Sequence, residues 1–264
     1  MGRSIFCAEP ARSLYRNGES ALFSQRTRGF VPLPLEVRED NGLAMSGMKG
    51  VIFDWDGVVI DSSAQHERSW EILAQEISKP LPEGHFKLGF GQKNQVIIPG
   101  ILQWASEEKE VQDLADRKEE IYRGLVRASG VHILPGAREL LIALQEKGVP
   151  AAVGSSTPRG NLRAIFAATG LDRFFQAVVC GDDVINGKPA PDVFLLAAEK
   201  LGLPPAGCLV IEDAHAGIEA ALRAGMRVLA VATTNPLQDL HAATDALESL
   251  TGVTPDRLAA VFLK

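Results

Sequence analysis

Two aspartates, Asp54 and Asp56, stand one residue apart at the end of an apolar run and are followed by Gly57. Side chains on an extended strand alternate between its two faces, so both carboxylates can point toward one site while Trp55 points away. Carboxylates held this close repel each other, and a hard divalent cation offsets the repulsion because it prefers oxygen ligands. The spacing therefore indicates a place where acidic groups do chemistry.

Three further polar clusters follow apolar runs later in the chain. They are Ser155 with Ser156 and Thr157, then Lys188, and then Glu212 with Asp213. Taken singly, each cluster is more often a turn, a helix cap or a solvated side chain. Ligands of a doubly wound sheet bind beyond the carboxyl ends of its strands, so four clusters at successive strand ends predict one shared site.

The residue types in these clusters suit attack on a phosphate monoester. An aspartate with an ordinary pKa of about 3.9 is ionised at pH 7, so Asp54 can attack phosphorus without a base, which a serine would need. Asp56 can protonate the leaving alcohol and then activate the water that hydrolyses an aspartyl phosphate. Lys188 and the hydroxyl of Ser155 are expected to orient the transferred group.

The same carboxylates predict a magnesium site. We expect the side chains of Asp54 and Asp213 to bind Mg²⁺, with the backbone carbonyl of Asp56 as a further oxygen ligand. Glu212 is expected to act at the ion through water or by holding Lys188.

A recurrent pattern of short apolar run, polar loop, amphipathic helix and glycine runs from residue 133 onward. This pattern is typical of a parallel sheet with crossover helices, each helix ending at a glycine cap. The expected strands are 50–54, 150–154, 177–180, 208–211 and 227–232. The sequence therefore predicts an α/β fold with a Rossmann-like, doubly wound parallel sheet.

An inserted small helical cap domain is expected between the first strand and the rest. Residues 62–132 look helical throughout and are too many for a loop. The core domain would then comprise residues 48–61 and 133–264, joined to the cap by two short tethers that can hinge.

Residues 1–47 read as a leader without helical or strand periodicity, either disordered or the product of a mis-annotated start, since Met45 or Met48 stands just before the first strand. Its arginines and scarcity of acids are also typical of an organelle transit peptide.

No apolar run reaches the roughly 18 residues of a membrane-spanning helix. The three cysteines have no metal-like spacing and indicate a reducing compartment, so we expect a cytoplasmic protein, or an organellar one if the leader is a transit peptide.

Composition limits the partners. With 46% hydrophobic residues the chain is expected to be soluble and globular with a sizeable core. A net charge of −6 without a basic tract argues against a nucleic-acid surface. We expect the partner to be a small phosphorylated metabolite, neither nucleic acid nor membrane, and the protein to be a monomer or a weak homodimer.

Four segments resemble, in order, the motifs of the haloacid dehalogenase superfamily. They are DWDGVVIDS at 54–62, GSSTPR at 154–159, GKPAPDVF at 187–194 and VIEDAHAGIEAALRAGM at 210–226. The resemblance covers roughly residues 49–250. It implies a Rossmann-like core with Asp54 as nucleophile, Asp56 as general acid and base, Ser155 and Lys188 on the phosphoryl group, and Asp213 with Asp54 on Mg²⁺. The segment between the first two motifs resembles the helical cap of the subgroup that contains phosphoglycolate phosphatases and β-phosphoglucomutase.

Within this family the reaction class remains open between phosphatase and mutase. Dehalogenase members lack the second acid of the pair, so Asp56 argues against dehalogenation. His66 occupies the place where β-phosphoglucomutases carry a histidine that gates the general acid, which favours a mutase. Where those mutases carry a cap arginine and a cap lysine, this chain has Gln92 and Gly124, although Lys93 and Arg123 each lie one residue away and are open as substitutes. Losing both charges harms a mutase more, because it must bind a bisphosphate and exclude water.

We therefore expect Mg²⁺-dependent hydrolysis of a small sugar or polyol phosphate through an aspartyl phosphate. A β-phosphoglucomutase-like mutase is the alternative, and a catalytically idle member that binds a phosphorylated ligand is the second alternative. The side chains expected to contact the substrate are His66, Gln92, Lys93, Asn94, Ser156 and Arg159.

Overall fold

The computed structural model describes residues 47–89 and 92–264. The predicted leader, residues 1–47, therefore lies outside the described residues except for Gly47. Within the described part of the chain, none of the helices is both long enough and apolar enough to pass through a membrane.

A six-stranded parallel sheet forms the centre of the fold, as predicted, with strand order β5-β4-β1-β6-β7-β8. The strands are β1 (Gly50–Phe53), β4 (Ala151–Gly154), β5 (Ala177–Val179), β6 (Cys208–Glu212), β7 (Arg227–Val231) and β8 (Asp245–Leu247). The first five agree with the expected strands to within one residue at each end, and β8 was not predicted. The central strand β1 pairs with β4 on one side and β6 on the other.

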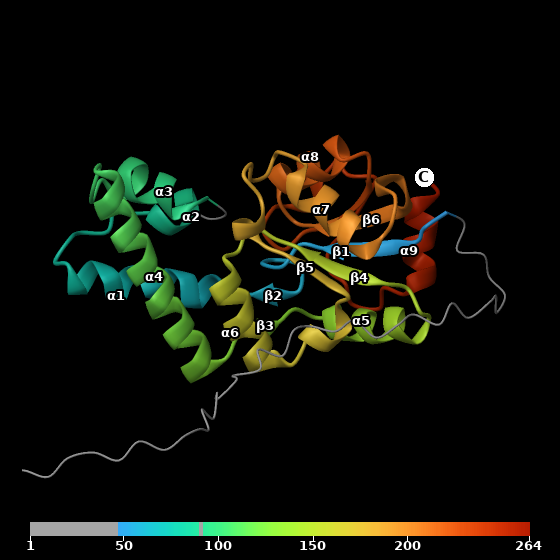
Figure 1. Cartoon of the computed structure of the whole chain (residues 1–264), viewed down its shortest axis with the longest axis horizontal. Coiled ribbons are helices and arrows are strands. Elements are labelled where there is room, and N and C mark those ends of the chain that lie inside the picture. Colours follow the sequence, from blue (N-terminus) through green and yellow to red (C-terminus); the bar gives the residue numbers. More distant parts are fainter. Residues whose placement is uncertain (1–46, 90–91) are drawn as a thin grey trace, which may run out of the picture. The chain divides into compact units, whose positions relative to one another are not determined.

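Helices cover both faces of this sheet (Figure 1). They are α5 (Ala137–Glu146), α6 (Arg159–Thr169), α7 (Asp192–Leu201), α8 (His215–Arg223) and α9 (Pro255–Phe262). Single 3₁₀ turns lie at Asp172–Phe174, Gly181–Asp183, Pro205–Gly207 and Leu237–Asp239. Strand side chains alternate between two apolar clusters: Val51 and Phe53 pack with α5, α6 and α9, whereas Ile52 packs with α7 and α8. Because both faces are buried, the strands read in sequence as unbroken apolar runs.

Residues 62–132, which we call the cap segment, have an apolar cluster of their own. The segment holds α1 (Ser63–Glu76), α2 (His85–Gly89), α3 (Asn94–Val96), a π-helical turn (Ile97–Leu102) and α4 (Glu108–Ser129). Trp70, Leu73, Ile98 and Trp104 are buried in its cluster. Two short strands, β2 (Ile60–Asp61) and β3 (His132–Ile133), pair antiparallel and tie the two ends of the segment together. The division into a cap domain and a core domain stays a prediction.

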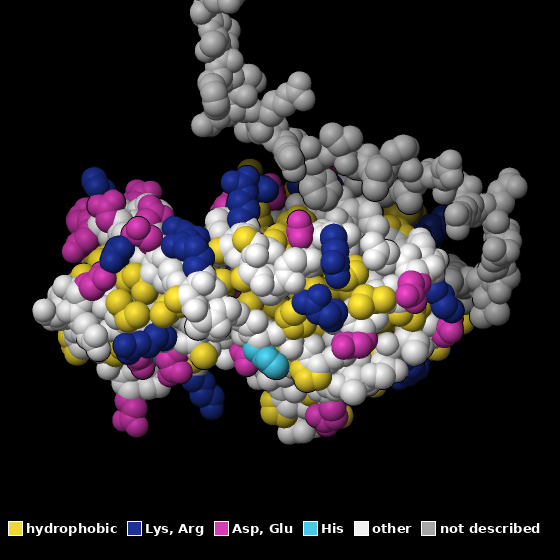
Figure 2. All heavy atoms as spheres, turned by 90° about the horizontal axis from the view of Figure 1, so that it is seen from below, with side chains coloured by type: hydrophobic (Ala, Val, Ile, Leu, Met, Phe, Trp, Pro, Cys, Tyr) yellow, Lys and Arg dark blue, Asp and Glu magenta, His cyan; other side chains and the backbone are white. Residues whose placement is uncertain are grey.

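Charged side chains are mixed on the face that Figure 2 shows. Lys and Arg lie among Asp and Glu instead of gathering in one patch, on the described part of that face. This face therefore offers no continuous basic surface for a nucleic-acid backbone.

Candidate active site

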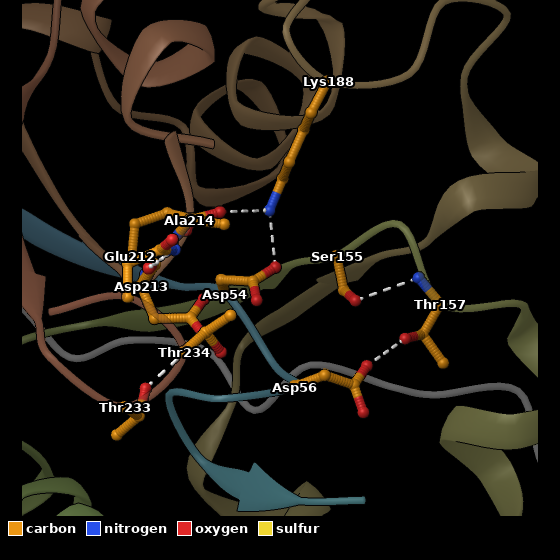
Figure 3. Close-up of polar contacts among 11 residues, drawn as sticks. Asp54, Asp56, Ser155, Thr157, Lys188, Glu212, Asp213, Ala214, Thr233 and Thr234 are labelled. Carbon is orange, nitrogen blue, oxygen red and sulfur yellow. Dashed lines mark hydrogen bonds and ion pairs between the residues drawn. The ribbon is translucent and has the colours of Figure 1, made fainter. Parts of the chain in front are cut away.

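The carboxyl ends of the central strands bring three acidic residues together (Figure 3). Asp54 follows β1, Glu212 ends β6 and Asp213 comes next. Each offers a carboxylate oxygen such that the three oxygens lie within 4.8 Å of one another, and all three residues are buried. Two of the four predicted clusters thus meet at one sheet edge, because parallel strands end at the same edge.

Lys188 points into this acidic group from the loop between β5 and α7 (Figure 3). Its Nζ lies 2.5 Å from Oδ1 of Asp54 and 2.8 Å from Oε1 of Glu212. Its side chain is only 9% exposed. One buried ammonium group therefore neutralises part of the charge of two carboxylates at once.

The acidic group nevertheless has too little positive charge. Burial raises the pKa of Asp54 to about 7, with repulsion from Glu212 acting in the same direction and Lys188 opposing it. Burial also raises the pKa of Asp213 well above its ordinary value, assisted by Glu212 and Asp54. For Lys188, burial alone would lower the pKa, but Asp54 and Glu212 outweigh burial and raise it. One lysine does not balance three buried carboxylates, so the site favours a bound cation.

Glu212 has both carboxylate oxygens occupied. Its Oε2 accepts hydrogen bonds from the backbone N–H groups of Asp213 and Ala214, each at 2.7 Å, while its Oε1 faces Lys188. A Cβ atom at Gly217 would lie 1.5 Å from Oε1 of Glu212, so the first turn of α8 must have glycine there. The structure therefore makes Glu212 a residue that orients its neighbours.

Asp213 is held by the loop that follows β7. Thr234 Oγ1 donates a hydrogen bond to its Oδ2, and Asn235 Nδ2 donates to its backbone carbonyl at 2.9 Å. Thr233 Oγ1 donates to the carbonyl of Gly57, whose φ is +83° and whose Cβ would lie 1.9 Å from Oδ2 of Asp213. This loop was not predicted, although a Thr-Thr-Asn run directly after an expected strand is a fifth polar cluster at a strand end.

Asp54 and Asp213 have the oxygens that a divalent cation requires. Among the described residues, Oδ2 of Asp54 and Oδ1 of Asp213 receive no hydrogen bond. Carboxylate oxygens are the ligands that hard divalent cations prefer. The buried group of Asp54, Glu212 and Asp213 therefore fits a metal ion, and the choice of Asp54 and Asp213 as its side-chain ligands stays a prediction.

The carboxylate of Asp56 lies outside this group of three. It accepts hydrogen bonds from the hydroxyls of Ser62 and Thr157 (Figure 3 draws the second). Burial raises the pKa of Asp56, while the hydrogen bonds from Ser62 and Thr157 oppose the rise. The backbone N–H of Thr157 donates in turn to Oγ of the buried Ser155 at 3.0 Å. Asp56 and Ser155, both predicted, thus meet through Thr157.

Two of the predicted substrate residues follow β4: Ser156 lies on the loop and Arg159 is the first residue of α6. Ser156 is exposed. Arg159 forms an ion pair with Asp183, and its backbone N–H donates to Asp182 at 2.8 Å. Arg159 therefore contacts the acidic turn at Gly181–Asp183 and not the three buried carboxylates. Its role in binding substrate stays a prediction.

Lys93 and Gln92 lie in the cap segment. The Nε2 of Gln92 donates to the carbonyl of Leu88 at 2.8 Å. Lys93 is exposed and forms no ion pair with any of the other described residues. Its Nζ lies 3.6 Å from the position that a Cβ of Gly187 would take, next to Lys188 in sequence. The structure thus places one cation of the cap segment against the loop that carries Lys188.

His66 lies in a small polar cluster with two residues that were not predicted. Its ring stacks on Tyr122 with centroids 4.0 Å apart, and its Nδ1 lies 2.6 Å from Nζ of Lys118. Burial and the charge of Lys118 lower the pKa of His66 to about 3, so the ring is neutral. Lys118 Nζ also lies 3.0 Å from Oε1 of Glu119. The sequence did contain a signal for this cluster: Lys118 lies four residues before Tyr122 on the apolar stripe of a helix, so the two side chains are neighbours.

The fold and the site together define a Rossmann-like α/β protein whose reactive carboxylates lie at the carboxyl edge of a parallel sheet. The chain belongs to the haloacid dehalogenase-like hydrolases, because the model of that family matches residues 48–225. The resemblance found in the four sequence motifs is thereby confirmed.

Relatives in this family include a phosphatase and a mutase. The chain is 35% identical over 221 residues to the chloroplastic 5-amino-6-(5-phospho-D-ribitylamino)uracil phosphatase of Arabidopsis thaliana, a match that covers 83% of this chain and 57% of that protein. It is 33% identical over 196 residues to the β-phosphoglucomutase of Bacillus subtilis, covering 72% of this chain and 86% of that protein. A crystal structure of a HAD hydrolase, family IA, variant 3, from Entamoeba histolytica is similar with a TM-score of 0.75 and 28% identity, over 82% of this chain and 100% of that one.

Proposed function

We propose that this protein is a Mg²⁺-dependent phosphatase that hydrolyses small phosphorylated metabolites, of the sugar or polyol phosphate type, through an aspartyl phosphate on Asp54. One observation carries the proposal: Asp54 is buried beside Lys188 and among the carboxylates of Glu212 and Asp213. A phosphatase among the relatives supports the same reaction.

Asp54 and Asp56 take different roles because their surroundings differ. The carboxylate of Asp54 attacks phosphorus, with Lys188 beside its Oδ1 to screen the repulsion from the phosphoryl oxygens. Asp56 is held by Ser62 and Thr157, and its pKa is raised, chiefly by burial, toward the range of a general acid. It donates a proton to the leaving alcohol and afterwards accepts one from the attacking water. The hydroxyl of Ser155 orients the phosphoryl oxygens.

Asp54 and Asp213 are the proposed side-chain ligands of Mg²⁺, together with the backbone carbonyl of Asp56. Bound there, the ion supplies the positive charge that three carboxylates and a phosphate jointly lack. Glu212 holds Lys188 and the N–H groups at the start of α8, and so keeps the two ligands in place.

The cap segment supports hydrolysis over phosphoryl transfer between sugar hydroxyls. Gln92 and Gly124 carry no charge at two places where the mutases of this family have a cation. We assign Lys93, with Asn94 beside it, to contact with the leaving group of the substrate. Mutase activity is the second candidate, because His66 stacks on Tyr122 beside Lys118 and a mutase stands among the relatives. A catalytically idle role is the third, and it is disfavoured because every motif acid is present.

A cytoplasmic location is proposed, with an organelle as the alternative. The Arabidopsis relative is chloroplastic, which supports the alternative. A fluorescent fusion at the carboxyl end of the full chain separates the two: diffuse cytosolic signal agrees with the proposal, and organellar signal contradicts it.

Phosphate release in the presence of Mg²⁺ tests the reaction against a panel of sugar, polyol and nucleotide monophosphates. The proposal requires release from several sugar or polyol phosphates, with no isomer formed. Conversion of β-glucose 1-phosphate to glucose 6-phosphate, dependent on a bisphosphate primer, would instead establish the mutase. Asp54→Asn should release no phosphate in this assay. Asp113→Asn is its control, because it makes the same change at an exposed aspartate in α4.

A further inference from the structure

Glu119 joins the cap segment to the core through its two carboxylate oxygens. Its Oε1 accepts a hydrogen bond from Nδ2 of Asn94 at 2.7 Å, and its Oε2 accepts one from Nδ2 of Asn161 at 2.5 Å. Asn94 begins α3 in the cap segment, whereas Asn161 belongs to α6 of the core. Glu119 is only 8% exposed, so both bonds form away from solvent. A single buried carboxylate therefore holds two separate segments of the chain.

Asn161 is fully buried and completes this contact. Its Oδ1 accepts a hydrogen bond from Nη1 of Arg123 at 3.3 Å. Arg123 lies four residues after Glu119 and therefore projects from the same side of α4. The same guanidinium lies 3.4 Å from the position that a Cβ of Gly160 would take. The first turn of α6 thus fits between two side chains of α4.

Both ends of this network reach the proposed site. Asn94 directly follows Lys93, whose ammonium group lies against Gly187 next to Lys188. Asn161 lies in the helix that begins just after Thr157, the residue that holds Asp56. Any shift of α4 relative to α6 therefore moves Lys93 relative to the reacting group.

Glu119 is charged in this position, which makes its bonds strong. Although burial opposes ionisation, Lys118 and His66 together with the amide groups of Asn161 and Asn94 lower the pKa of Glu119 to about 2. Hydrogen bonds to an ionised acceptor are roughly twice as strong as those between neutral groups.

We propose that Glu119 is a positioning residue: by bonding Asn94 and Asn161 together, it fixes Lys93 over the phosphate site and so sets which leaving groups the enzyme accepts. The effect on substrate choice rests on the proposed phosphatase function, whereas the bridge between α3 and α6 does not. A purely local role is the rival explanation, in which Glu119 serves only to balance the charge of Lys118.

Exchanging the two partners' functional groups separates these explanations. Glu119→Gln keeps one acceptor oxygen for two asparagine donors, so its own amide group faces that of Asn161 or Asn94 and one of the two bonds is lost. Asn161→Asp sets two carboxylates against each other. The double variant Glu119→Gln with Asn161→Asp restores a donor facing an acceptor, and the carboxylate that it introduces in α6 can still accept from Arg123. Asn161→Ala removes the bridge and leaves Glu119 beside Lys118.

Hydrogen exchange measured without substrate reads the bridge directly. We expect amides of residues 93–97 and 160–163 to exchange at least about tenfold faster in Glu119→Gln and in Asn161→Ala, and to return to within about threefold of wild type in the double variant. Glu120→Gln is the matched control, because it makes the same change at the neighbouring exposed position. Wild-type exchange in Asn161→Ala, or no recovery in the double variant, would refute the bridge.

Kinetics test the consequence for substrate choice. The ratio of kcat/KM for fructose 1-phosphate to kcat/KM for p-nitrophenyl phosphate should fall about tenfold in Glu119→Gln and recover in the double variant, since the p-nitrophenyl group carries no sugar hydroxyl groups for Lys93 to contact. An unchanged ratio with altered exchange would overturn the specificity role. If wild type releases no phosphate from any ester, the proposed function fails, while the exchange data still decide the bridge.

Discussion

The environment of Asp54 contains more negative than positive charge. Three buried carboxylates surround a single ammonium group, and burial with mutual repulsion raises the pKa of both Asp54 and Asp213. Such an arrangement costs stability unless positive charge is added, and perturbed pKa values of this kind gather at functional sites. The shortage of positive charge is therefore the best indication of what binds there.

Replacing Asp54 by Asn should abolish turnover and preserve the fold. The amide is isosteric with the carboxylate but is not a nucleophile, so we expect phosphate release to fall by about 10³-fold or more. Circular dichroism and the melting temperature, compared with those of Asp113→Asn, check that the fold is intact. Retained activity in a folded Asp54→Asn protein would mean that another residue attacks phosphorus.

His66 should make the protein less stable in mild acid. Its pKa is lowered to about 3 in the folded state against about 6.5 unfolded, so the unfolded chain binds more protons and stability falls as the pH drops below about 6.5. Between pH 7.5 and 5.5 this one group should remove about 1.4 kcal/mol from the free energy of unfolding. Urea denaturation at both values checks it, and the loss should be smaller by that amount in His66→Gln. Equal losses in the two proteins would contradict the assignment.

At the scale of elements, strands with a repeated pattern were predictable and contacts between helix faces were not. Strands β1, β4, β5, β6 and β7 are buried apolar runs followed by polar loops, so the strands and the residues at their ends could be located from the sequence. Strand β8 has only three half-buried residues and begins with Asp245, which leaves no such signal. The contacts among Glu119, Asn94 and Asn161 depend on how α4 lies on α6, which no local pattern encodes.

Two helical glycines should respond oppositely to alanine. A Cβ at Gly124 in α4 would meet nothing within 4 Å, so Gly124→Ala should raise the free energy of unfolding by about 0.5–1 kcal/mol through helix propensity. Gly217 in α8 is the matched comparison, because a Cβ there would lie 1.5 Å from Glu212, and Gly217→Ala should lower stability. Chemical denaturation of both variants measures the difference, and a destabilised Gly124→Ala protein would contradict the open space around α4.

At the scale of the whole molecule, the site is assembled from residues far apart in the chain. Asp54, Ser155, Lys188 and Asp213 come from four different strand-to-helix connections, and only the parallel order of the sheet places them together. The cap segment leaves and returns through β2 and β3, so its helices are an insertion that does not interrupt the sheet. The buried acidic group and the cap segment therefore come from separate stretches of the sequence.

Binding of Mg²⁺ should stabilise the folded protein as a whole. A ligand that binds only the folded state at 100 times its Kd adds about 2.7 kcal/mol, here by neutralising the buried carboxylates. We expect a higher melting temperature with Mg²⁺, a return to the lower value with EDTA, and parallel loss and recovery of activity. Asp213→Asn should remove most of the shift. A melting temperature indifferent to Mg²⁺ and EDTA would argue against a metal between Asp54 and Asp213.

Detection of the phosphoryl group on the enzyme tests the central claim most directly. Wild-type protein is quenched in acid during turnover of a sugar phosphate with Mg²⁺, digested, and its peptides are analysed by mass spectrometry. The proposed mechanism predicts one phosphoryl group on the peptide that contains Asp54, absent in Asp54→Asn and absent without Mg²⁺. Turnover that leaves Asp54 unmodified while another residue carries the phosphoryl group would contradict it.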